Sequence, residues 1–176
     1  MSNYRRAKLQ GATYFFTVNC LQRRGNTLLV DHIDTLKSVI GRVHQLHPFH
    51  IDAWVILPEH MHCVWTLPEG DADYSTRWRL IKTLFSRQLP KTEHRSTTRL
   101  HYGERGIWQR HYWEHLIRDD LDFQRHIDYV HVNPLKHGLV NAVKEWPHST
   151  FHAYVERGIY PHNWCGDLNM DNIGNE

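Results

Sequence analysis

The fold of this chain is decided by residues 57–68, which read LPEHMHCVWTLP. Residues 61–67 are mostly apolar and are predicted to form a strand that ends at Pro68. Residues 49–57 predict another strand, which ends at Pro58. The link between the two strands is too short for anything but an antiparallel turn. The sequence therefore predicts two neighbouring antiparallel strands here.

The segments on either side extend this pair into a sheet with helices. Residues 13–19 are β-branched and aromatic, which predicts a strand, and residues 107–117 resemble a further strand. Apolar residues at helical spacing predict one helix over 33–46 and another over 75–89, the second capped by Ser75. The two helices are expected to pack on one face of the sheet.

A third helix is predicted to begin at Asp119 and Asp120, because carboxylates favour a helix N-terminus. It is predicted to end at Asn133, because the residue before Pro134 avoids the helical conformation. The polar residues 90–106 predict a mobile loop. The element order is then β-α-β-β-α-β followed by a helix, which is a ferredoxin-like α+β fold with an antiparallel sheet and an additional C-terminal helix.

Length and composition indicate one domain of ordinary size, since the chain has 176 residues and is 40% hydrophobic. No stretch approaches the roughly 18–20 apolar residues of a membrane span, and the N-terminus lacks the apolar run of a signal peptide. A cytoplasmic protein with no membrane partner is therefore expected. Cys20, Cys63 and Cys165 are too far apart to suggest a disulfide framework or a zinc ribbon.

The net charge of +2 hides an uneven distribution. Residues 1–44 carry +5 and residues 73–118 carry +6, whereas residues 45–72 carry −4 and residues 119–176 carry −5. Two basic blocks fit a phosphate-binding face. A mixed, solvated surface explains the same charges equally well, so the charge pattern alone leaves the partner open.

His60 and His62 form a candidate metal site. On a strand they share one face, while Met61 points into the core. Two imidazoles at this spacing can chelate a divalent metal. The chain has 16 histidines, however, so a His-x-His triplet can also arise by chance.

Tyr129 and Asn133 lie four residues apart on the predicted third helix and therefore on one helical face. Asn133 offers a carbonyl oxygen as a third metal ligand. Tyr129 offers a phenol that can attack a phosphodiester and later leave again. Without other context, a tyrosine packed on the sheet with its hydroxyl in water is the alternative interpretation.

Two segments together resemble a known family. Residues 57–68 resemble the His-hydrophobic-His motif of HUH transposases that use a single catalytic tyrosine. Residues 127–140, IDYVHVNPLKHGLV, resemble the tyrosine helix of these enzymes and its exit. The Tyr-x-x-x-Asn spacing and the tail that begins at Trp146 are similar to the REP-associated tyrosine transposases. Mobile-element relatives usually carry Gln where this chain has Asn133.

The resemblance implies an enzyme that cleaves and rejoins single-stranded DNA carrying a hairpin, as in repetitive extragenic palindromes. It implies Mg²⁺ or Mn²⁺ held by His60, His62 and Asn133, and Tyr129 as the nucleophile on the additional helix. The intermediate would be a 5′-phosphotyrosine with a free 3′-hydroxyl. The REP-associated branch is expected to be monomeric rather than dimeric.

The same resemblance divides the chain into a transposase domain over 1–145 and a tail over 146–176 that packs on the domain or contacts DNA. Basic side chains near the sheet edge and on the second helix are the candidate DNA contacts, with ordinary solvated charges as the alternative. These candidates are Arg5, Arg6, Arg23, Arg24, Arg77, Arg79 and Lys82. Trp78, Trp108 and Trp113 are predicted to lie in the core rather than to stack on bases.

Two other functions compete with this one. The first is a catalytically silent, hairpin-binding regulatory protein of the same fold, which a nicking assay would separate from an enzyme. The second is a zinc hydrolase that adds His131 or Cys63 to the histidine pair. Cys63 directly follows His62 and is expected on the other side of the strand, which weakens the second option.

Overall fold

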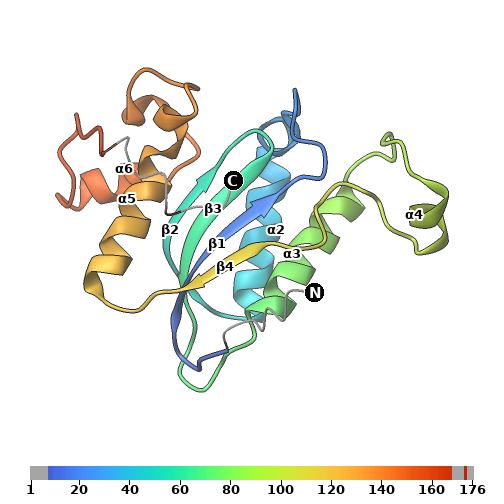
Figure 1. The fold of residues 1–176 in the computed structure, drawn as a ribbon, viewed down its shortest axis with the longest axis horizontal. Helices are drawn as coiled ribbons and strands as arrows, with labels where there is room; N and C mark the ends of the chain where they lie inside the picture. The colour runs from blue at the N-terminus through green and yellow to red at the C-terminus, as the bar shows by residue number, and fades with distance from the viewer. Residues whose placement is uncertain (1–7, 168–172, 174–176) are drawn as a thin grey trace.

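The computed structural model describes residues 8–167 and 173, and its centre is a four-stranded sheet (Figure 1). The strands are β1 (Thr13–Asn19), β2 (His50–Ile56), β3 (His60–Thr66) and β4 (Trp113–Leu116). Their order is β2-β3-β1-β4, and every neighbouring pair is antiparallel. This order and element sequence confirm the predicted ferredoxin-like α+β fold.

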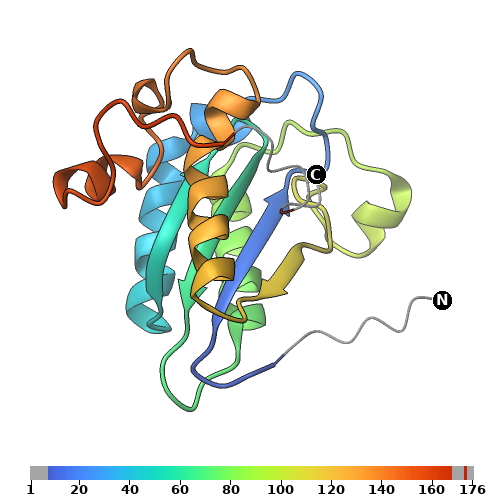
Figure 2. The same cartoon turned by 60° about the vertical axis from the view of Figure 1, so that its left-hand side comes forward.

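Helices cover both faces of the sheet (Figure 2). Helix α2 (Ile33–Leu46) and helix α3 (Tyr74–Gln88) pack together on one face, as predicted, and α5 (Asp120–Lys136) lies across the other. The shorter elements are α1 (Leu28–Asp31), α4 (Thr97–His101), the 3₁₀ helix η1 (Val143–Glu145) and α6 (Phe151–Glu156). Among the described residues, none of the helices combines the length and the apolar composition that a membrane span requires.

The alternation of side chains along β3 separates two cores. Met61, Cys63 and Trp65 are buried in the core beneath α2 and α3. Val64 belongs to the core beneath α5, and His60 and His62 lie on that same face by the two-residue period of the strand. The prediction that Met61 points into the core, away from the histidine pair, is confirmed.

The core beneath α2 and α3 is aromatic. Trp65 and Trp78 stack with ring centroids 4.3 Å apart, and Trp78 is fully buried, as predicted. Trp108 is half-buried and packs against Phe85. Trp113 contradicts its prediction, because 38% of its surface is exposed on the edge strand β4.

The predictions for the cap of α3, for residues 90–106 and for the length of the fourth strand were wrong. Asp73 rather than Ser75 caps α3, because its carboxylate accepts from the Thr76 amide at 3.0 Å. The segment 90–106 contains helix α4, and Arg105 ties that segment to the backbone oxygens of α3's last turn. The fourth strand is short because residues 107–112 leave the sheet, apart from a single bridge to Cys20.

Helix α5 also runs through Pro134 and ends at Lys136 instead of stopping before the proline. Pro134 has no amide to donate to the carbonyl four residues earlier, and only two helical residues follow it. The next turn is still closed, since the His137 amide donates to Asn133 O at 3.0 Å. Because of this extra turn, Lys136 lies beside the Tyr129 ring and the His137 ring lies beside the His60 ring.

The segment after η1 lies along the outer edge of β2. The Trp146 indole donates to Ile56 O at 2.9 Å, and the Thr150 amide donates to Trp54 O at 2.9 Å. The Tyr154 hydroxyl donates to Asp52 O at 2.7 Å. The Ser149 hydroxyl accepts from the Phe151 amide at the start of α6, 3.1 Å away. Contact between this tail and DNA stays a prediction.

Candidate functional site

The two histidines of β3 are held in fixed orientations by hydrogen bonds at Nδ1. His60 Nδ1 lies 2.8 Å from Glu59 Oε1, and His62 Nδ1 lies 2.9 Å from Thr17 Oγ1 on β1. Both imidazoles are buried. Such bonds leave Nε2 as the atom that can bind a metal, and His60 Nε2 has no hydrogen-bond partner among the residues that the structure describes.

His137 joins this pair at the end of α5. One donor atom each from His60, His62 and His137 lie within 4.8 Å of one another. His137 was not predicted as a site residue, although it follows Tyr129 and Asn133 at the same four-residue spacing. The supposed stop at Pro134 concealed this signal, because it placed His137 outside the helix.

Tyr129 lies against the histidine pair in the same chain. Its ring centroid is 5.2 Å from that of His62, at an interplanar angle of 74°, and it packs edge-on to Phe15. The Lys136 ammonium lies 5.0 Å from the Tyr129 ring centroid. Asn133 is fully buried one helical turn after Tyr129. The structure therefore brings the predicted strand and helix residues together, and adds a cation beside the phenol.

Glu59 links the histidine pair to the surface. Burial alone would raise the pKa of its carboxyl, but the hydrogen bond and charge of His60, with a smaller effect of Arg23, lower that pKa below its usual value. Arg23 Nη2 lies 3.4 Å from Glu59 Oε1. The carboxylate therefore stays ionised and orients His60, as second partners of metal-binding histidines do.

The additional zinc ligands of the hydrolase alternative lie elsewhere. Cys63 faces the opposite core. His131 Nε2 is 2.8 Å from Thr150 Oγ1, and burial together with the nearby His152 lowers the pKa of His131 to about 3. Neither residue adds a donor to the histidine pair, so the structure does not support that alternative.

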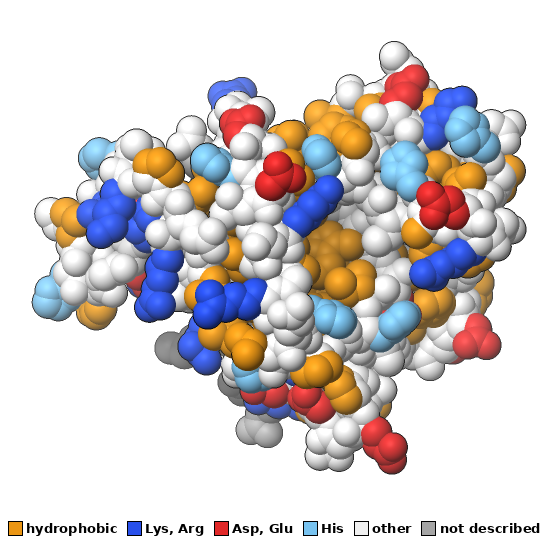
Figure 3. All heavy atoms as spheres, turned by 180° about the vertical axis from the view of Figure 1, so that it is seen from behind, with side chains coloured by type: hydrophobic (Ala, Val, Ile, Leu, Met, Phe, Trp, Pro, Cys, Tyr) orange, Lys and Arg blue, Asp and Glu red, His pale blue; other side chains and the backbone are white. Residues whose placement is uncertain are grey.

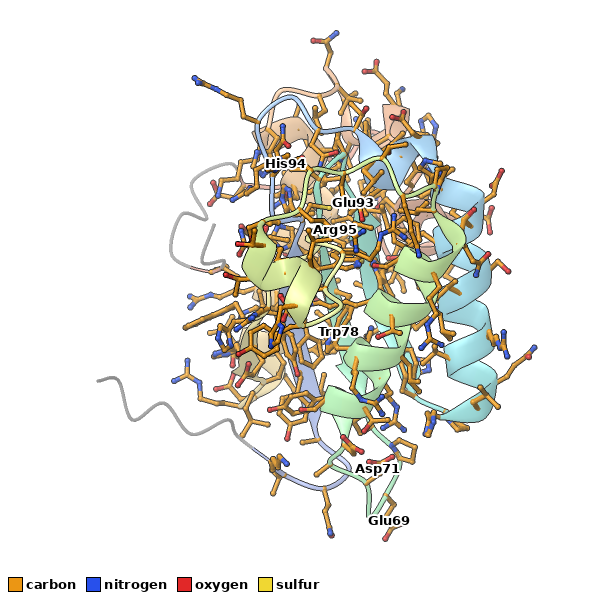
Figure 4. All side chains as sticks on the ribbon, turned by 90° about the vertical axis from the view of Figure 1, so that its right-hand side faces the viewer. Glu69, Asp71, Trp78, Glu93, His94 and Arg95 are labelled. Atoms are coloured by element: carbon orange, nitrogen blue, oxygen red, sulfur yellow. The ribbon has the colours of Figure 1, made fainter. Side chains whose placement is uncertain are left out.

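A basic groove lies on the opposite side of the sheet, between α3 and residues 103–112. Its volume is about 870 Å³. Its basic lining residues are Arg79, Lys82, Arg87, Arg99, Arg105 and Arg110. Lys and Arg side chains gather over α3 and α4 in Figure 3, and Figure 4 shows the loop with Glu93, His94 and Arg95 that connects these helices. Strand β4 forms the sheet edge between this groove and the histidine face.

The other predicted DNA contacts differ in their surroundings. Arg24 is exposed, and Arg23 is half-buried beside Glu59. Arg5 and Arg6 lie outside the described residues. Arg77 is only 2% exposed, so its prediction as a DNA contact is withdrawn. Its guanidinium donates to His47 O, Pro48 O, Asp73 O and Asp71 Oδ2, which joins the start of α3 to the end of α2.

Replacing Arg77 by Leu is expected to lower the free energy of unfolding by about 2–4 kcal/mol, because buried acceptors are left without donors. The Arg77 hydrogen bond also holds the pKa of Asp71 below its usual value. A carboxyl with a lowered folded-state pKa stabilises the fold at neutral pH, and this contribution disappears as the pH falls. The difference between the two proteins should therefore shrink below about pH 4.

Urea unfolding at neutral and acidic pH measures this difference. The exposed neighbour Arg79 provides the control, since Arg79→Leu should change stability by no more than about 0.5 kcal/mol. Equal stability of the Arg77→Leu variant and the original protein at neutral pH would contradict a structural role.

Comparison with known proteins gave close relatives along almost the whole chain. The chain is 48% identical over 168 residues to the REP-associated tyrosine transposase of Escherichia coli K12, covering 96% of this chain and 93% of that protein. It is 47% identical over 171 residues to a putative REP-associated tyrosine transposase of Haemophilus influenzae, covering 97% of each.

A solved structure described as the REP-associated tyrosine transposase bound to a REP hairpin superimposes with a TM-score of 0.85 at 46% identity, covering 100% of this chain and 98% of that one. No family model matched the chain.

Proposed function

The chain belongs to the REP-associated tyrosine transposase family, and from this premise we propose that it binds hairpin DNA and cleaves and rejoins an adjacent single strand through Tyr129. The position of the Tyr129 ring, 5.2 Å from that of His62, carries the proposal. A family member solved with a REP hairpin supports the same class of DNA partner.

The residues at the site fit a divalent metal, which we expect to be Mg²⁺ or Mn²⁺. His60 and His62 would hold it through Nε2. Asn133 on α5, or His137 directly after the end of α5, would complete the set. The buried, unpartnered Nε2 of His60 supports this assignment. When bound, such an ion polarises the scissile phosphate and stabilises the charge that develops on it.

Tyr129 is the proposed nucleophile. Its hydroxyl oxygen forms a bond to phosphorus while the bond from phosphorus to the 3′ oxygen breaks. The proton that leaves the phenol is balanced by the proton that the departing 3′ oxygen takes up. The strand then ends in a free 3′-hydroxyl and a 5′-phosphotyrosine, and attack by a 3′-hydroxyl reverses the step. The Lys136 charge beside the ring would stabilise the phenolate.

One chain holds both halves of the proposed active site. His60 and His62 come from β3 and Tyr129 from α5, and the two elements are in contact within the chain. No exchange of helices between subunits is needed to assemble them, which supports a monomer. Incubating the protein with labelled hairpin DNA and Mn²⁺ tests the function, because an enzyme gives a covalent protein–DNA band. A silent hairpin-binding protein of the same fold binds the DNA and gives none.

We further propose that Trp113 stacks on an unpaired base beside the active site. It lies directly opposite Thr17, which lies directly opposite His62, so all three share one face of the sheet. Its indole is partly exposed on the edge strand.

Trp113→Ala is expected to weaken the binding of single-stranded flanking DNA about tenfold, since stacking contributes roughly 1–3 kcal/mol per base. Fluorescence anisotropy with a hairpin that carries the flanking strand and with a blunt hairpin measures the effect. Only the first should bind more weakly. Trp113→Phe retains a ring and serves as the matched control, and an equal weakening on both DNAs would argue against stacking.

The basic groove between α3 and residues 103–112 is the proposed surface for hairpin phosphates. Arg79 and Arg87 are exposed along it. The Arg79→Ala/Arg87→Ala variant should bind hairpins about tenfold more weakly, and the slope of log K against log salt should fall by about 0.9 for each phosphate that the variant no longer neutralises. Binding titrations at several salt concentrations provide both values.

Arg42 on α2 is exposed and does not line the groove, so Arg42→Ala is the control for this measurement. An unchanged salt slope in the double variant would place the hairpin on another surface.

A further inference from the structure

A second cluster of metal-ligating side chains lies where β4 meets the first turns of α5. One donor atom each from His115, Asp122 and His126 lie within 4.8 Å of one another. His115 Nε2 is 2.8 Å from Asp122 Oδ2, and His126 Nδ1 is 3.2 Å from Asp122 Oδ1. The two imidazoles stack nearly parallel with centroids 4.6 Å apart.

We propose that His115, Asp122 and His126 form a second metal site, which takes a transition-metal ion such as Zn²⁺. Two imidazoles and one carboxylate form a three-ligand set that zinc accepts, with the fourth position open to water. Around a tetrahedral ion with bonds of about 2.1 Å the donors lie roughly 3.4 Å apart, so small side-chain rotations bring them into place. Mg²⁺ prefers oxygen ligands and is not expected to bind there.

Neighbouring groups hold the three side chains in position. His126 Nδ1 donates to the backbone oxygen of Asp122, 2.7 Å away, which fixes the plane of the ring. The Asp122 carboxylate accepts from the Arg118 amide at 3.0 Å, and its own amide donates to the Asp119 cap at 2.8 Å. His126 is 5% exposed and His115 is half-buried, so the cluster opens to solvent on one side.

Metal binding would replace the hydrogen bond between His115 and Asp122 by bonds from both residues to one ion. Any proton on the imidazole nitrogens that become ligands is released to water. No oxidation or reduction is involved. The proposal does not depend on catalysis by Tyr129.

The proposed site connects β4 to the helix that carries Tyr129, so a bound ion would help to position that helix. His126 precedes Tyr129 by three residues and thus by about one helical turn. Phe15 packs against both of them, with ring centroids 4.8 Å from His126 and 5.8 Å from Tyr129. A bound ion would fix the N-terminal half of α5 on the sheet and so restrict the movement of the tyrosine.

The experiment uses the full chain with His60→Ala and His62→Ala, which removes the pair on β3 and leaves the second cluster intact. Zn²⁺ titration by calorimetry should give one equivalent in this background, with a rise in Tm on zinc addition. Mg²⁺ should give neither signal. Adding Asp122→Asn, which has nearly the same shape, should weaken Zn²⁺ binding at least about tenfold and remove the rise in Tm.

His115→Gln is a second disabling variant, and its half-buried position makes loss of the fold less of a concern. The matched control is His50→Gln. His50 lies 3.6 Å from Asp52 but belongs to no three-donor cluster among the described residues, so this change should leave zinc binding intact. Zinc affinity unchanged in both Asp122→Asn and His115→Gln, or no zinc binding in the background protein, would overturn the proposal.

Discussion

Replacing Tyr129 by Phe is expected to abolish the covalent protein–DNA adduct, with nicking reduced at least about a thousandfold, because nothing replaces the attacking oxygen. The ring remains, so its packing against His62 and Phe15 should persist. Hairpin binding should therefore change less than about twofold, since binding is expected to depend on basic side chains. Denaturing gel electrophoresis of labelled DNA measures the adduct, and an equilibrium titration measures binding.

Tyr154→Phe is the matched control for this experiment. Its hydroxyl contacts the backbone of Asp52 and takes no part in the histidine site. This variant should form the adduct at nearly the original rate. Full nicking by Tyr129→Phe would remove Tyr129 as the nucleophile, even if the family assignment stands.

The second large effect is expected from His60→Ala and from His62→Ala. In each variant, metal-dependent cleavage should fall by at least about a hundredfold, because the remaining ligands cannot hold the ion that stabilises the reacting phosphate. EDTA should reduce cleavage by the original protein to a similar extent. Added Mn²⁺ should restore the activity of the EDTA-treated original protein but not that of the two variants. Cleavage rates at several Mn²⁺ concentrations test both statements.

Both histidines are buried, so loss of the fold has to be separated from loss of the metal. Hairpin affinity provides that separation, since the proposed hairpin surface, the basic groove, is on the other side of the sheet. His50→Gln, at an exposed position on β2, is the control for removing a histidine. Cleavage that persists in EDTA would count against the metal.

Local patterns were enough to predict the fold and which residues share the face of the sheet that holds the candidate site. The two-residue period of a strand placed His60 and His62 opposite Met61, and the turn at Pro58 required an antiparallel neighbour. The four-residue spacing of Tyr129 and Asn133 placed both on one side of α5.

Contacts between distant segments could not be predicted in the same way. Thr17 supports His62 only because β1 pairs with β3 in one particular register. Arg77 and Arg79 look alike in the sequence, yet one is buried among backbone oxygens and the other lines a groove. Pro134 was interpreted by its usual effect on helices, whereas α5 continues past it to Lys136.

Residues 148–150, which lie along the outer edge of β2, limit how other chains can pair with the sheet. A sheet edge with unpaired amides and carbonyls can recruit a foreign strand, and proteins protect such edges. Residues 148–150 satisfy the backbone of Trp54 and Ile56 on that side. Strand β4 forms the opposite edge of the sheet. It carries Trp113 and lies between the basic groove and the face that holds the histidine pair. Because residues 148–150 protect the β2 edge, a strand from another molecule is expected to approach the sheet at β4 instead.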